Sequence, residues 1–171
     1  MNTHKTVVSF ALCLLFSMGG NCQSGPSLMC AIPLDGSEMG FTLSVPAGFE
    51  CSSVSSLQAL LVVSRVNYVQ ADTGTAISVV VSMPQGDGNQ TLDGVTITDQ
   101  GTLMNPNGLE FDLEKLDFDL DTFGMQTSYS GGITLPSGNN LIISVTAEQD
   151  SMTLADVLEE VLNTVEFVSQ S

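Results

Sequence analysis

Short apolar runs separated by turn residues divide the chain from Cys30 onward, and they constrain its fold more than any other feature. Residues 41–45 (FTLSV) alternate strictly between apolar and polar side chains and end at a proline, as a half-buried strand does. Similar extended runs, some of them linked by turn residues such as ADTG and PSGN, cover 60–69, 76–83, 109–120, 132–135 and 141–147. The pattern predicts an antiparallel β-sheet.

The last part of the chain changes period from two to between three and four. Its apolar residues recur on one helical face, at Leu154, Val157, Leu158, Val161 and Leu162. Ser151 or Thr153 can cap the N-terminal end of such a helix, and a short extended run follows at 165–168. We therefore expect an α+β fold in which a C-terminal helix packs on the antiparallel sheet.

The N-terminal residues have the features of an export signal. Lys5 precedes an apolar stretch at 7–16 (VVSFALCLLF), and small residues (SMGG) follow it. This stretch is too short to span a bilayer as a helix, and no other run approaches ~18 apolar residues. We expect a signal peptide at 1–22, a tether and N-terminal segment at 23–37, and one domain at 38–169. The protein is then exported, and is secreted, periplasmic or envelope-associated.

The four cysteines fit this interpretation. Cys13 leaves with the signal, and Cys22 is either removed with it or becomes the acylated first residue of a lipoprotein. Both routes leave Cys30 and Cys51, an even pair in an oxidising compartment. Parity thus predicts a disulfide between these two residues, and two small buried thiols are the alternative.

Acidic residues greatly outnumber basic ones. From residue 23 onward the chain keeps all 19 Asp and Glu residues against two basic ones, Arg65 and Lys115, so its formal charge is −17. Such a surface repels the phosphates of nucleic acids and anionic lipid heads. His4, the one histidine, lies in the signal, so the mature chain has no Ser–His or Cys–His pair and no histidine-ligated zinc. We expect no nucleic-acid partner, no enzymatic activity, no catalytic residues and no cofactor.

The order of the elements, with two short motifs, resembles the PsbP-like α/β/α sandwich superfamily. A leading strand ends in VPAGF at 45–49, a meander ends in NLIISV at 140–145, and the terminal helix runs into TVEF at 164–167. The likeness covers roughly residues 38–169, and within the superfamily the chain resembles the bacterial exported, DcrB-like type. Members of the superfamily are binding or assembly factors rather than enzymes. The resemblance therefore implies an interaction with a protein partner and transfers no active site.

Residues 71–76 (ADTGTA) are spelled like the catalytic loop of aspartic proteases. That chemistry needs two carboxylates that share one proton, and a chain with one such motif could supply them only as a dimer. Asp72 follows Gln70-Ala71 rather than the hydrophobic residues expected there. An aspartate and a glycine between two β-branched runs are also what a hairpin turn requires, with Gly74 at positive φ. The turn is the favoured interpretation.

Alternating acids at 110–121 invite a calcium hypothesis. Asp117, Asp119 and Asp121 match the first three ligands of an EF-hand loop, but Thr122 and Ser128 stand where the loop needs glycine and glutamate. As a strand, the same segment places the three aspartates toward water. They remain weak metal candidates. The apolar parity also slips near 114–116, where a bulge or a turn is expected.

Three functions follow in order of preference. The first is an exported, acidic, non-enzymatic protein with a binding or assembly role through a protein or envelope partner. The second is a calcium-assisted, β-rich binding module. A dimeric aspartic protease built on Asp72 is a distant third. The sequence specifies no oligomeric state.

Overall fold

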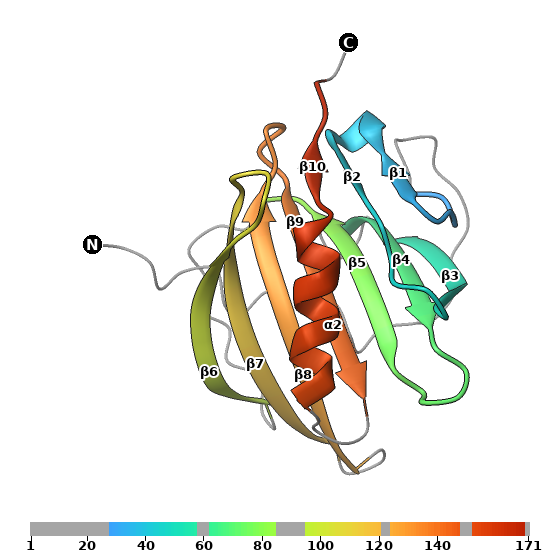
Figure 1. Ribbon diagram of the computed structural model, residues 1–171, viewed down its shortest axis with the longest axis vertical. Helices are drawn as coiled ribbons and strands as arrows, with labels where there is room; N and C mark the ends of the chain where they lie inside the picture. Colours follow the sequence, from blue (N-terminus) through green and yellow to red (C-terminus); the bar gives the residue numbers. More distant parts are fainter. Residues whose placement is uncertain (1–27, 58–61, 85–94, 121–123, 148–151, 170–171) are drawn as a thin grey trace.

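A seven-stranded antiparallel sheet forms the centre of the molecule (Figure 1). The computed structural model describes residues 28–57, 62–84, 95–120, 124–147 and 152–169. The strand order is β3-β4-β5-β9-β8-β7-β6, so β3 and β6 are the two edges. The strands are β3 (Glu50–Leu57), β4 (Val62–Val69), β5 (Ala76–Ser82), β6 (Val95–Met104), β7 (Glu110–Leu120), β8 (Gly124–Thr134) and β9 (Asn140–Ala147).

A second, small sheet joins the beginning of the domain to its end. Its strands are β1 (Leu34–Gly36), β2 (Phe41–Leu43) and β10 (Glu166–Phe167), and a 3-10 turn, η1 (Ser37–Met39), connects β1 to β2. Both β1 and β10 pair with β2 in antiparallel register. Strand β1 therefore lies inside the range 23–37 that the sequence assigns to a tether and N-terminal segment.

The helix α2 (Met152–Asn163) covers one face of the large sheet and crosses β8 and β9 in the view of Figure 1. Its buried residues are Leu154, Leu158, Val161 and Leu162, as their spacing predicts. Gly131 of β8 lies directly beneath it, and a Cβ at Gly131 would stand 2.7 Å from Cδ1 of Leu162. A side chain at this position would force the Leu162 side chain to move. The predicted α+β fold with a packed C-terminal helix is confirmed.

The main core fills the space between α2, the small sheet and the facing side of the large sheet. Its largest fully buried side chains are Tyr68, Phe41 and Phe111. The hydroxyl of Tyr68 donates a hydrogen bond of 2.8 Å to the carbonyl of Ala31, so the one polar atom of this ring is satisfied. These contacts fix the N-terminal segment against the sheet.

Apolar residues on both faces of β7 explain the parity slip in the sequence. Phe111 and Leu116 are both buried although five positions separate them, which places them on opposite faces. The bulge or turn expected near 114–116 is wrong, because β7 is continuous there and pairs with β8 without interruption from Asp112 to Leu120. The irregularity lies instead on the neighbouring strand β6, between Ile97 and Asp99.

The segment that resembles a protease loop is the turn between β4 and β5. The amide of Gly74 donates to the carbonyl of Gln70 at 2.9 Å, and Gly74 has φ +69°. Asp72 is exposed at the tip. The turn interpretation is confirmed.

The predicted disulfide is present and closes the N-terminal segment onto the edge of the sheet. Cys30 is bonded to Cys51 of β3, with a sequence separation of 21 and a Cα–Cα distance of 5.7 Å. Just before it, the amide of Leu28 donates to Oγ of Ser64 at 2.8 Å. Cys22 lies outside the described residues.

No helix in the described part of the chain has the length and apolar character needed to cross a membrane.

Candidate functional site

A groove of about 220 Å³ opens between α2 and the strands β6, β7 and β8. We name it the α2 groove. Its floor is formed by side chains from all four elements, with a glycine on β6 that leaves space above the sheet. These floor residues are Gly101, Leu103, Leu113, Tyr129, Leu158 and Leu162.

The floor is apolar because two amphipathic patterns meet there. Leu158 and Leu162 belong to the buried stripe of α2, and side chains of Leu162 and of Leu113 on β7 both lie within 3.4 Å of the point where a Cβ on Gly131 would stand. Gly101 pairs with Leu113, and a Cβ built on Gly101 meets nothing within 4 Å. The groove is therefore open on the β6 side, where a larger residue would occupy it.

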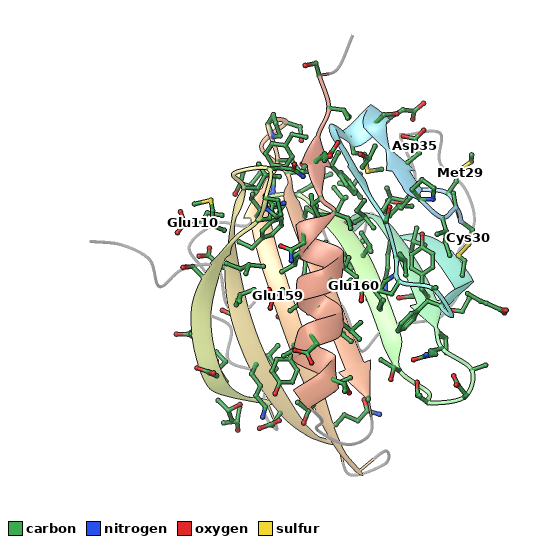
Figure 2. The ribbon with its side chains drawn as sticks, in the orientation of Figure 1. Met29, Cys30, Asp35, Glu110, Glu159 and Glu160 are labelled. Carbon is green, nitrogen blue, oxygen red and sulfur yellow. A yellow bond between two sulfur atoms is a disulfide. The ribbon has the colours of Figure 1, made fainter. Side chains whose placement is uncertain are left out.

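Charged groups stand at the rim. Asp99 of β6 lies opposite Lys115 of β7, and Lys115 lies opposite the floor residue Tyr129 of β8. The Lys115 ammonium lies 5.3 Å from the centre of the Tyr129 ring, which is a cation–π distance. Glu159 adds a second exposed carboxylate from α2, and Figure 2 shows it on the side of the helix that faces β7, with Glu160 on the other side.

Asn105 fixes the helix against the β6–β7 hairpin that forms the groove. Its side chain is 4% exposed, and its amide donates to the carbonyls of Leu162 and Val165 at 3.0 Å each. Its Oδ1 accepts from the amides of Asn107 and Leu109 at 3.0 and 2.9 Å. The same side chain thus closes the hairpin turn and binds one carbonyl in the last turn of α2, that of Leu162, and one just after the helix, that of Val165.

The sequence reasoning missed Asn105. The available signal was NPNG at 105–108, a turn pattern between two extended segments that locates the hairpin. Its link to α2 spans 57 residues and was not readable from local spacing.

The face of the sheet opposite α2 carries a polar row. The row follows the register across six strands, from β4 to β6, through Asn67, Ser78, Ser144, Ser130, Glu114 and Gln100. Burial raises the pKa of Glu114 from 4.5 to about 7, while a hydrogen bond with Gln100 lowers it and the Asp112 carboxylate raises it. Its Oε2 has no hydrogen-bond partner within the described residues. This carboxyl group therefore titrates near neutral pH.

Replacing Glu114 by glutamine is expected to change how stability depends on pH. The unfolded chain releases this proton near pH 4.5 and the folded chain near pH 7, so the group's contribution to stability falls as pH rises through that window. As pH rises from 4.5 to 8, the free energy of unfolding of Glu114→Gln should increase by roughly 2 kcal/mol relative to that of the wild type. Urea unfolding at several pH values measures this. A constant difference between the two proteins would contradict the assignment.

Of the three aspartates predicted as weak metal candidates, the structure describes the side chain of Asp117 alone, and this side chain does not line the groove. The carboxylate of Asp117 is half-buried and accepts a 2.8 Å hydrogen bond from Thr127. The side chain of Asp119 and the whole of Asp121 lie outside what is described, so their role as metal ligands stays a prediction. Within the described residues, no group of three acidic, histidine or cysteine side chains is placed to hold a metal ion.

Comparison with known proteins confirms the fold. No protein-family model matches the chain, and no curated protein matches it in sequence. The solution structure of cyanobacterial PsbP (CyanoP) from Synechocystis sp. PCC 6803 is similar to it with a TM-score of 0.53 and 14% identity, covering 91% of this chain and 99% of that chain. The chain therefore has a PsbP-like fold. The DcrB-like type stays a prediction.

Proposed function

We propose that the mature chain is an exported, acidic, non-enzymatic protein that binds a protein partner, in the envelope or outside the cell, through the α2 groove. The observation that carries this proposal is the chemistry of the groove. Its floor is apolar and its charged groups stand at the rim, as the exposed carboxylates of Asp99 on β6 and Glu159 on α2 and the half-buried Lys115 on β7. Such a site binds by burying an apolar group of its ligand, while the polar rim fixes the orientation.

The charge of the chain selects the class of partner. The full sequence has 19 acidic and three basic residues, a formal charge of −16, and two of the carboxylates, Asp99 and Glu159, flank the groove. The resulting field accelerates the approach of a positively charged surface and disfavours an acidic one. We infer a basic partner.

Export is supported by the Cys30–Cys51 disulfide, because such bonds persist in oxidising compartments. A mass spectrum of the protein from its native source tests this part. We expect a chain that begins at or after Cys22, two hydrogens lighter than its reduced form, with an acyl chain if Cys22 is retained. A chain that keeps Met1 and reduced cysteines would contradict export.

Site-specific photo-crosslinking in the native host tests the groove. A photoreactive residue in place of Glu159 should capture a defined partner, whereas the same residue in place of Glu160 should not, since Glu160 lies outside the groove. Both positions are exposed on one helix, so they form a matched pair. Equal capture from both positions, or none from either, would contradict the proposal.

A further inference from the structure

Strand β6 is the open edge of the large sheet. It occupies the last position in the strand order and pairs with β7 alone among the described strands. Residues 96–102 are all exposed. An edge of this kind presents backbone N–H and C=O groups that can form hydrogen bonds with a further strand. One of them, the amide of Gln100, donates to Oδ1 of Asp99 at 2.9 Å, so an added strand would have to displace that carboxylate to pair there.

The opposite edge, β3, is protected in ways that β6 is not. Strand β3 has two register irregularities against β4, and the disulfide of Cys51 ties the N-terminal segment to it. Strand β6 has one irregularity, between Ile97 and Asp99, and contains no proline or lysine, the residues that commonly block edge pairing. Its ten residues, VTITDQGTLM, are also rich in residues that favour strands.

The outer edge of β6 is also one wall of the α2 groove. Asp99, Gly101 and Leu103 lie on alternate positions of β6, and all three line the groove. A strand added to β6 would therefore direct every second side chain toward the same side of the sheet as α2. The position beside Gly101 has open space where a Cβ would stand, so an apolar side chain from the added strand can enter there.

The geometry points to strand addition as the way a partner binds. We propose that an extended segment of a basic partner protein pairs with β6 as an eighth strand and inserts one apolar side chain into the α2 groove over Gly101. This inference rests on the proposed function and adds the mode of binding to it. Backbone hydrogen bonds would supply affinity, and the groove and its carboxylates would supply specificity. A second copy of this chain fits poorly, because it has three basic residues against 19 acidic ones.

A synthetic peptide tests the mode of binding without knowledge of the partner. In the probe, threonine alternates with lysine, and one leucine replaces the central lysine. The leucine and the lysines therefore lie on the same face of the extended peptide. The mature protein should bind it and show slowed hydrogen exchange at alternate amides of β6. N-methylation of the peptide amides that face β6 should weaken binding at least about tenfold, while N-methylation of the intervening amides should have little effect.

Two controls address the groove. Gly101→Val keeps the strand intact, because its Cβ meets no neighbour, but occupies the opening. It should weaken binding of the leucine peptide about tenfold, and it should weaken binding of a peptide with alanine in place of the central leucine much less. Glu160→Lys serves as a charge control outside the groove, whereas Glu159→Lys should weaken both peptides.

The outcomes separate the two proposals. Binding that perturbs the α2 groove but leaves hydrogen exchange of β6 unchanged would overturn strand addition and support the groove. Slowed exchange at β6 with no effect of Gly101→Val or Glu159→Lys would overturn the role of the groove. Failure to bind the peptide, together with self-association that is lost when proline replaces Gln100 or Gly101, would overturn the basic partner in favour of a second copy.

Discussion

Alanine in place of Asn105 should lower the free energy of unfolding by about 3 kcal/mol. The substitution removes four hydrogen bonds, two to the carbonyls of Leu162 in the last turn of α2 and of Val165 just after it, and two from amides of the β6–β7 turn. The site is buried, so water cannot replace these bonds without entering the interface. Urea unfolding monitored by circular dichroism measures the loss.

Two neighbouring substitutions make this prediction specific. Asn107→Ala removes one side-chain hydrogen bond, to the carbonyl of Val165, from an exposed residue and should cost about 1 kcal/mol or less. Asn105→Asp keeps the acceptor but places a carboxylate against two carbonyl oxygens, so it should cost at least as much as the alanine variant. An Asn105→Ala protein as stable as Asn107→Ala would show that the helix is held by packing alone.

Removal of the disulfide should have a similarly large effect. The Cys30–Cys51 bond closes a loop with a sequence separation of 21, and chain entropy alone assigns such a loop about 3 kcal/mol. Cys30→Ser with Cys51→Ser should lower the free energy of unfolding by that amount. Because Cys30 is exposed and Cys51 half-buried, serine introduces little packing loss of its own.

The reduced wild-type protein is the control for this variant. Its unfolding midpoint should match that of the double serine variant, since both lack the same covalent constraint. A reduced protein as stable as the oxidised one would mean that the contacts of the N-terminal segment, such as Leu28 with Ser64, hold it in place without the bond.

The sequence predicted the elements whose side chains are buried in a regular pattern. The stripe of α2 and the alternating or continuous apolar runs of β2, β4, β5 and β9 mark their elements directly. Strand β6 was not recognised, because its exposed residues 96–102 leave no apolar period to read. Strand β3 has two register irregularities, which break the alternation that sequence analysis relies on.

The candidate site was not predictable because it exists only in the register of the sheet. Asp99, Lys115 and Tyr129 come from three strands, and only the pairing of β6 with β7 and of β7 with β8 brings them into one row. Glu159 joins them from α2. The acidic residues that the sequence did single out, Asp72 and Asp117, lie respectively at a turn tip and in a hydrogen bond with Thr127.

Affinity for the captured partner tests the central claim most directly. Once crosslinking at Glu159 has identified that partner, its dissociation constant should be measured for the wild type, Gly101→Val and Glu160→Lys. We predict that Gly101→Val raises the constant about tenfold or more, a loss of about 1.4 kcal/mol, and that Glu160→Lys changes it little. Unchanged affinity of a correctly folded Gly101→Val protein would contradict a partner-binding role for the α2 groove.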